Sequence, residues 1–366
     1  MIWRHDLVPQ YELYKDEIDS AIQSVLISGR YTLATHVNKF EEDFSKYVGS
    51  SYAVGVANAT DGLILALKLL DIKEGDEIIT TPFTAIPTVS AIIASGAKPV
   101  FVDICKDTYL IDLDKIGEAI TENTKAIMPV HLFGNVVDIK RLKNICGDIT
   151  IIEDASQAHG SMIDNVKVGA IGDLGVFSFY PTKNLGAIGD GGIIVTNNEN
   201  YYEKLKLLRM YGMTDYHHIK INGINSRLDE LQAAILGVKL RYLDEMNHKR
   251  NLIAEKYIHA LNTNFFQHQK INDNVFSNYH QFVSYVNFSK RDDLILHLQE
   301  NNIQTNIYYL LPLHLQKANE YLGYNKGDFP NAEFLCDNVV AFPIYPELSS
   351  INLNTILTNI NLFTNG

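Results

Sequence analysis

The sequence predicts an α/β protein with a mostly parallel sheet in a large unit, followed by a smaller α+β unit. Between residues 52 and 196, short apolar segments of strand length alternate with segments of helix length. Such alternation produces parallel sheets covered by helices on both faces. Beyond a long helical region at 228–261, the segments become shorter and mix both types. We therefore expect a large domain at residues 1–240 and a small domain at 241–366.

Each element follows from its hydrophobic pattern, taken in chain order. Apolar residues recur at helical spacing in 14–27 and in 37–47, which predicts two helices laid against a core. In the large unit we then expect strands at 52–57, 77–80, 98–102, 126–130, 149–153, 176–180 and 193–196, and helices at 62–70, 86–95, 113–120 and 137–146. In the small unit we expect strands at 281–288, 303–309 and 339–344, and helices at 290–300, 331–338 and 352–363.

Composition excludes several classes of protein. The net charge is −12 and no block of five basic residues occurs, which argues against nucleic acid as a partner. The 3 cysteines are scattered, unlike a disulfide framework or a zinc knuckle. The N-terminus lacks the apolar core of a signal peptide, and no apolar run is long enough to span a membrane. We expect a soluble cytoplasmic protein.

One lysine stands in an unusual setting. The segment 177–192, FSFYPTKNLGAIGDGG, combines an aromatic strand, a turn with Pro181 and Lys183, and a return rich in glycine. An amine shielded from water there would have a lowered pKa and could form a Schiff base. A surface lysine in a polar turn explains the pattern equally well, so other residues must decide.

Polar residues follow several predicted strands. In open α/β sheets, ligands bind at the carboxyl ends of the strands. The segment 58–61 follows one strand and opens a helix, so its backbone N–H groups and Thr60 could bind a phosphate, or Asn58 or Thr60 could simply cap the helix. Either Glu153 or Asp154 should face the same site. Such a carboxylate could pair with a protonated ring nitrogen, or form a structural salt bridge or helix cap.

Two common alternatives fail on context. Phe83 and His131 also lie at strand ends, but no His, Cys and carboxylate cluster has the spacing of metal ligands. The glycines after Lys183 follow the lysine rather than a first strand, which excludes a dinucleotide loop. A shielded lysine, a carboxylate, an anion site and an aromatic ring together match pyridoxal 5′-phosphate.

At these residues the chain resembles the DegT/DnrJ/EryC1/StrS family of sugar aminotransferases, which has the aspartate aminotransferase fold (fold type I). The resemblance covers nearly the whole chain. Its main segments are FEEDFSKYVG (40–49), VGVANATDGLILAL (54–67), GDEIITTPFT (75–84), GAKPVFVDI (96–104), TKAIMPVHLFG (124–134), IIEDASQAHG (151–160), GVFSFYPTKNLGAIGDGG (175–192), NSRLDELQAAIL (225–236) and PLHLQKA (312–318). No metal is implied.

The resemblance implies a role for each matching residue. Lys183 would bind the cofactor aldehyde, Asp154 the pyridine nitrogen and Gln157 the ring hydroxyl. Thr60 and Ser178 match phosphate-binding positions. The remaining implied cofactor contacts are the backbone at Ala59 and Asp61, the ring-stacking Phe83, and Asn225, which would reach the phosphate of a neighbouring subunit. The resemblance therefore implies a homodimer with shared active sites.

The resemblance also implies the substrates. The run NLGAIGDGG after Lys183 looks like members that aminate C-3 of a nucleotide-linked keto-sugar, whereas C-4 enzymes more often have a TTGEGG-like run. L-Glutamate would donate the amino group to a dTDP-linked keto-sugar. Candidate sugar contacts are Tyr180 and His314, and candidate diphosphate contacts are Lys220 and Arg250, although these could be core or surface residues. Alternatives are a C-4 or cyclitol aminotransferase, or a regulator without turnover.

Overall fold

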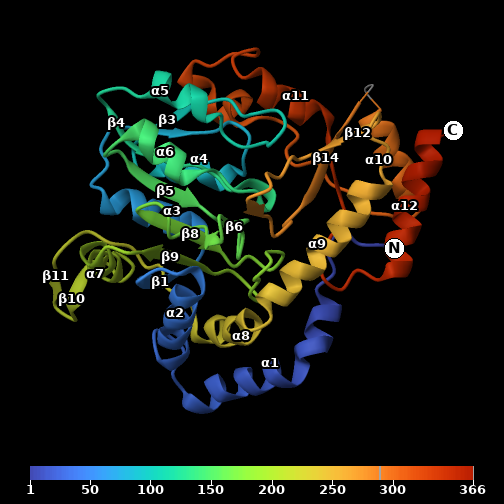
Figure 1. Ribbon diagram of the computed structural model, residues 1–366. Coiled ribbons are helices and arrows are strands. Elements are labelled where there is room, and N and C mark those ends of the chain that lie inside the picture. Colours follow the sequence, from blue (N-terminus) through green and yellow to red (C-terminus); the bar gives the residue numbers. More distant parts are fainter. Residues whose placement is uncertain (288–289, 366) are drawn as a thin grey trace.

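The computed structural model describes residues 1–287 and 290–365. Figure 1 shows a sheet layered with helices and, beside it, a smaller group of strands and helices near the C-terminus. The α-helices are α1 (Val8–Ser28), α2 (Thr35–Val48), α3 (Ala59–Leu69), α4 (Ile86–Ala94), α5 (Ile116–Ala119), α6 (Ile139–Cys146), α7 (Glu199–Leu208), α8 (Glu230–Leu240), α9 (Leu243–Ala260), α10 (Arg291–Glu300), α11 (Pro330–Asn338) and α12 (Ser350–Asn365).

The main sheet has seven strands in the order β1-β9-β8-β5-β4-β2-β3. Their bounds are β1 (Tyr52–Val56), β2 (Glu77–Thr80), β3 (Lys98–Phe101), β4 (Thr124–Ile127), β5 (Thr150–Asp154), β8 (Leu174–Ser178) and β9 (Gly192–Thr196). The pairs from β8 through β5, β4 and β2 to β3 are all parallel. Only β9 runs antiparallel to its neighbours β1 and β8. The expected mostly parallel sheet is confirmed.

Alternate strand residues face two different cores, and this alternation positions the site. On β5, Ile152 packs into the core formed with α3 and α4, whereas Ile151 packs into the core on the opposite face. On β8, Val176 belongs to the α3 side and Phe177 to the opposite side. Because side chains alternate along a strand, the last residue of each strand, Asp154 and Ser178, emerges on the α3 face.

On the opposite face of β5, Glu153 ties the sheet to the loop before β8. Its buried carboxylate accepts hydrogen bonds from His131 Nε2 (2.9 Å) and from the backbone N–H groups of Gly169 (2.8 Å), Ile171 (2.9 Å) and Gly172 (2.5 Å). Burial raises the pKa of Glu153, but these hydrogen bonds outweigh burial and hold the pKa below its usual 4.5. The two adjacent carboxylates therefore serve different purposes, and Glu153 has a structural one.

Smaller sheets and bridges complete the fold. The strands β12 (Phe266–His268), β14 (Phe282–Val286) and β15 (Val339–Phe342) form an antiparallel sheet packed by α9, α10 and α12. A second small sheet joins β13 (Val275–Phe276), β6 (Met162–Ile163) and β7 (Val166–Lys167), and β10 (Met213–Asp215) pairs with β11 (His218–Ile219). We propose that the boundary between domains 1–240 and 241–366 lies between α8 and α9.

Several predicted elements differ from the structure. The predicted strand at 303–309 is wrong, because this segment pairs only singly, at Ile303 with Ile2 and at Asn306 with Ala341. The region 228–261 is two helices, α8 and α9, separated by a turn at residues 241–242. The strand predicted at 176–180 is β8, two residues earlier, and residue 288 of the predicted strand 281–288 lies outside the described residues.

The segment from α7 to β11 received no prediction, although α7 carries a helical signal. Asn198 caps α7 by accepting hydrogen bonds from the backbone N–H groups of Asn200 and Tyr201, and Leu205 and Leu208 are buried at helical spacing.

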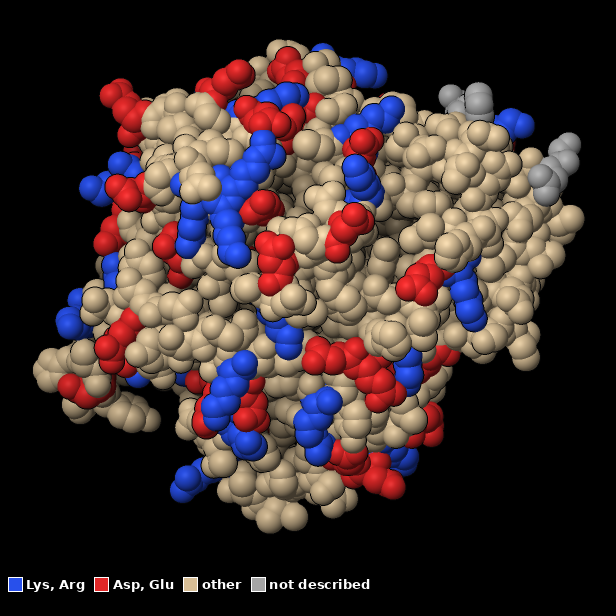
Figure 2. All heavy atoms as spheres, viewed as in Figure 1, with Lys and Arg blue, Asp and Glu red and all other residues tan. Residues whose placement is uncertain are grey.

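No helix among the described residues is long and apolar enough to cross a bilayer. On the face shown in Figure 2, acidic and basic side chains are interspersed.

We predict that Glu153→Gln lowers the free energy of unfolding at pH 7 by roughly 3 kcal/mol, because an amide N–H would meet backbone donors in a buried site. The control is Asp148→Asn, which makes the same chemical change at an exposed residue just before β5. Folding lowers the pKa of Glu153. Its contribution to the free energy of unfolding is therefore complete above pH 4.5 and is lost on acidification. Urea unfolding at several pH values measures the effect; equal losses in both variants would contradict it.

Candidate active site

A cavity of about 450 Å³ lies at the carboxyl ends of β5 and β8, beside the start of α3. Its lining residues are Asn58, Ala59, Thr60, Thr84, Ala85, Pro87, Thr88, Val130, Asp154, Ser156, Gln157, Ser178, Tyr180, Lys183 and Asp190. A larger cavity of about 570 Å³ is lined by α3, α4, α7 and residues 221–222, and contains none of the predicted site residues. The chemistry therefore points to the smaller cavity.

Asp154 projects into this cavity from the end of β5. Its Oδ2 accepts a hydrogen bond from Thr88 Oγ1 (2.8 Å), and its Oδ1 accepts one from the backbone N–H of Ser156 (3.2 Å). Thr88 Oγ1 also lies 3.2 Å from Thr84 Oγ1, which extends the polar chain along the start of α4. Asp154 is 4 % exposed. Two donors fix the buried carboxylate, and each oxygen keeps capacity for a further, cationic donor.

Lys183 reaches the same cavity from the turn after β8. Its backbone N–H donates to Tyr180 O (2.8 Å), which shapes the turn that Pro181 begins. Burial lowers the pKa of Lys183 from 10.5 to about 8, and the Asp154 carboxylate opposes this shift. The amine is therefore partly neutral near physiological pH and can act as a nucleophile or a base.

The start of α3 forms one end of the cavity. Asn58 caps the helix by accepting a hydrogen bond from the backbone N–H of Asp61 (2.9 Å), while Ala59 and Thr60 line the cavity. Gly192 makes this approach possible, since a Cβ there would lie 2.7 Å from Ala59 N and 2.6 Å from Asn58 C. The expected helix cap is therefore formed by Asn58, and the first helical turn faces the cavity, where a helix N-terminus attracts an anion. Phosphate binding at this turn remains a prediction. The backbone N–H of Asp61, expected to bind a phosphate, is instead engaged by the cap.

Gln157, Ser178 and Tyr180 complete the group that the fold brings together. Gln157 Oε1 accepts a hydrogen bond from the backbone N–H of Phe133 (2.9 Å). Ser178 Oγ accepts a weak hydrogen bond from the backbone N–H of Tyr180 (3.3 Å). The Tyr180 side chain is 54 % exposed, so it lies at the rim of the cavity.

Phe83 does not line the cavity, which corrects the expectation that its ring stacks on the cofactor. The ring is fully buried and packs edge-to-face against Tyr109, Phe133 and Tyr309, with centroid separations of 6.4, 6.2 and 5.7 Å. The residues that follow it, including Thr84 and Ala85, form the cavity wall instead. Burial of a large aromatic ring in the core outweighed the placement that its position suggested.

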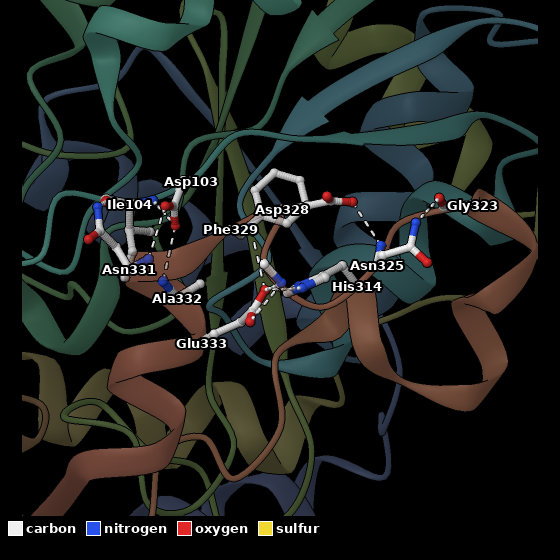
Figure 3. A network of polar contacts seen from close by, with 11 residues as sticks. Asp103, Ile104, His314, Gly323, Asn325, Asp328, Phe329, Asn331, Ala332 and Glu333 are labelled. Carbon is white, nitrogen blue, oxygen red and sulfur yellow. Dashed lines mark hydrogen bonds and ion pairs between the residues drawn. The ribbon is translucent and has the colours of Figure 1, made fainter.

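The expected roles of His314 and Arg250 are also corrected, because neither lines the cavity. His314 is 1 % exposed and its Nε2 lies 3.1 Å from Glu333 Oε1, within the polar network drawn in Figure 3. In that network Glu333 also accepts from the backbone N–H of Gly327, and Asp103 caps α11. Arg250 is 1 % exposed and donates to the carbonyl oxygens of Tyr279, His280 and Ile344.

Lys220 and Asn225 lie outside the cavity of their own chain. Both are exposed, and Lys220 directly follows the β10–β11 hairpin, which projects from the body at the left of Figure 1. Their expected contacts with a diphosphate and with a neighbouring subunit remain predictions. Sequence reasoning missed Thr88 and Tyr309, which contact Asp154 and Gln157 respectively. Thr88 lies in the first turn of α4 rather than at the end of β2, so a rule based on strand ends does not select it.

Comparison with known proteins places these features in a family. The model of the DegT/DnrJ/EryC1/StrS aminotransferase family matches residues 12–361. A dTDP-3-amino-3,6-dideoxy-alpha-D-galactopyranose transaminase from Aneurinibacillus thermoaerophilus is 42 % identical over 96 % of each chain. A protein named pleiotropic regulatory protein from Geobacillus stearothermophilus is 40 % identical over 98 % of this chain and 97 % of its own.

A solved structure gives the same result. The crystal structure of DesV from S. venezuelae superposes with a TM-score of 0.96 over 100 % of this chain and 98 % of its own, at 35 % identity. Similar chains have been crystallised with pyridoxal phosphate or pyridoxamine phosphate. The cavity described above suits this cofactor, because one wall offers a buried carboxylate, one a lysine of lowered pKa and one a helix N-terminus. The chain therefore belongs to the DegT/DnrJ/EryC1/StrS aminotransferase family and is a pyridoxal phosphate-dependent aminotransferase of fold type I.

Proposed function

We propose that the protein transfers an amino group from L-glutamate to the C-3 keto group of a dTDP-linked 6-deoxy sugar. The observation that supports amino transfer is the meeting of Lys183 and Asp154 in one cavity. The names of relatives support the substrate, since one relative that is 42 % identical and two that are 38 % identical are called transaminases of dTDP-3-amino sugars. The run NLGAIGDGG after Lys183 also favours amination at C-3.

Each side chain of the cavity has a separate role in such a transfer. Pyridoxal phosphate supplies an aldehyde that holds the amino group and a ring that accepts electrons from the bond being broken. Lys183 Nζ, partly neutral near pH 7, can take the proton from the Cα of the amino-acid donor. The Asp154 carboxylate, oriented by Thr88, would hold a positive charge on a ring nitrogen. The first turn of α3 and Ser178, which line the cavity, would hold the phosphate.

The charges of the cavity bear on how a nucleotide sugar would be held. Among its lining residues, Lys183 is the single cation, whereas Asp154 and Asp190 are acidic. A diphosphate therefore needs cations from outside this lining. We propose that a second copy of the chain supplies them in a homodimer, with the exposed Lys220 as the candidate cation for the diphosphate. The exposed, neutral Asn225 is the candidate contact with the cofactor phosphate of the neighbouring subunit.

Two other functions are alternatives to this proposal. A C-4 keto-sugar or cyclitol aminotransferase would use the same lysine and carboxylate on another ketone. A regulator without turnover is suggested by the name of one relative. The intact Lys183, Asp154, Gln157 and Ser178 argue against an idle site, since a buried carboxylate and a shielded lysine that share one cavity are typical of a functional site.

Amino transfer from L-glutamate to a dTDP-3-keto-6-deoxy sugar should give a C-3 amine and one equivalent of 2-oxoglutarate. Product regiochemistry by NMR, with the dTDP-4-keto and UDP-linked 3-keto sugars in parallel, tests this proposal. A C-4 amine as the main product would overturn the C-3 assignment. Absence of 2-oxoglutarate with all three ketones would favour the regulator.

The lowered pKa of Lys183 predicts how fast the apoprotein takes up pyridoxal phosphate. Only the neutral amine attacks an aldehyde, so the rate should rise with pH and level off above a midpoint of about 8. The difference of 2.5 between 10.5 and 8 makes the neutral fraction at pH 7 about 300 times that of an ordinary lysine. Stopped-flow absorbance measures the rate, and N-acetyl-lysine under the same conditions corrects for titration of the aldehyde. A midpoint near that of the free amine would contradict the prediction.

A further inference from the structure

The phenol of Tyr309 contacts the active-site cavity through Gln157. Gln157 Nε2 donates a hydrogen bond to Tyr309 Oη at 3.1 Å. Tyr309 comes from residues 303–309, in the C-terminal part of the chain, whereas Gln157 follows β5 of the main sheet. This hydrogen bond therefore joins the C-terminal region to a residue that lines the cavity.

Together, two hydrogen bonds leave the Gln157 amide one orientation. The backbone N–H of Phe133 is a donor, so the amide atom that faces it (2.9 Å) must be Oε1. Nε2 then lies on the other side, and one of its two hydrogens is directed to Tyr309. Because the amide is planar, the second hydrogen of Nε2 has a fixed direction. Gln157, which lines the cavity, thus keeps one N–H that neither of these two contacts uses.

Tyr309 is itself firmly held. Its ring packs face-to-face against Phe133 (6.2 Å, 24°) and edge-to-face against Phe83 (5.7 Å, 78°). Burial raises the pKa of the Tyr309 phenol, so the group remains an uncharged hydroxyl at physiological pH. The buried Phe83, which does not face the cavity, thus acts as a support for the residue that orients Gln157.

The backbone on the N-terminal side of Tyr309 is clamped from two sides. Ile2 pairs with it through Ile2 N–H to Asn302 O (2.7 Å) and Gln304 N–H to Ile2 O (2.9 Å). On the other side, Asn306 exchanges two backbone hydrogen bonds with Ala341 of β15. The single bridges that rule out a regular strand at 303–309 therefore still fix this segment, and with it the position of the Tyr309 hydroxyl.

We propose that Tyr309 is a positioning residue, whose hydroxyl orients the Gln157 amide so that its free N–H meets the ring hydroxyl of pyridoxal phosphate. The inference rests on the assignment of this cavity as the cofactor site. A donor to the ring oxygen withdraws negative charge from it and weakens its hold on the proton of the adjacent Lys183 nitrogen. Loss of an oriented donor should therefore raise the pH at which the bound cofactor loses that proton.

The test is a pH titration of the cofactor absorption band in the loaded protein. Tyr309→Phe keeps the ring and removes the hydroxyl, and should raise the midpoint by about 0.5–1 pH unit, as expected for one hydrogen bond. The matched control is Tyr308→Phe, the same change one residue earlier, where the hydroxyl accepts from Arg4 and does not touch Gln157. We expect the control to leave the midpoint unchanged, and an equal shift in both variants would overturn the proposal.

A double-mutant comparison separates positioning from direct contact. In a Gln157→Leu background, Tyr309→Phe should cause no further shift, because its effect passes through Gln157. A full shift in that background would mean that Tyr309 contacts the cofactor itself, which contradicts the proposed role. If Gln157→Leu does not fold, the comparison of Tyr309→Phe with Tyr308→Phe decides alone. Failure of the wild-type protein to bind pyridoxal phosphate would instead overturn the site assignment, and this inference with it.

Discussion

The parallel pairing of β5 with β8 is the constraint on which the active site depends. In this register, Ile152 lies beside Leu174 and Asp154 beside Val176, so both strands end within two residues of each other. Strand alternation then places Asp154 and Ser178 on the α3 face, and the turn after β8 brings Lys183 to the same cavity. A slip of one residue in β5 would turn Asp154 to the opposite face and put Glu153, with its longer side chain, in its place.

The opposite face of the sheet keeps this register in place. Glu153 binds His131 and three backbone N–H groups of the loop before β8, so the two strands are linked by side-chain contacts as well as by their ladder. Adjacent carboxylates with separate partners explain why one can serve chemistry while the other serves folding. On the α3 face, Gly192 permits the close approach of α3 to β9, which brings a helix N-terminus to the cavity.

The sequence was most informative where a residue's role depends on backbone position. Lys183, Asp154, Gln157, Ser178 and Thr60 all line one cavity, because strand ends and turns can be located from pattern and resemblance. It was least informative where tertiary packing decides. Phe83, His314 and Arg250 carry suitable chemistry at suitable positions, yet all three are buried among partners that lie far away in the sequence. Tyr309 was missed for the same reason, since its contact with Gln157 spans 152 residues.

The most direct test of Lys183 and of glutamate as donor is the absorbance of the protein loaded with pyridoxal phosphate, before and after addition of L-glutamate, with Lys183→Ala alongside. We expect the visible band of the loaded protein to disappear on addition of glutamate, with release of 2-oxoglutarate, and the variant to show no such response. A wild-type protein that binds the cofactor yet leaves glutamate unchanged would contradict glutamate as donor. A variant that responds like the wild type would contradict the central role of Lys183.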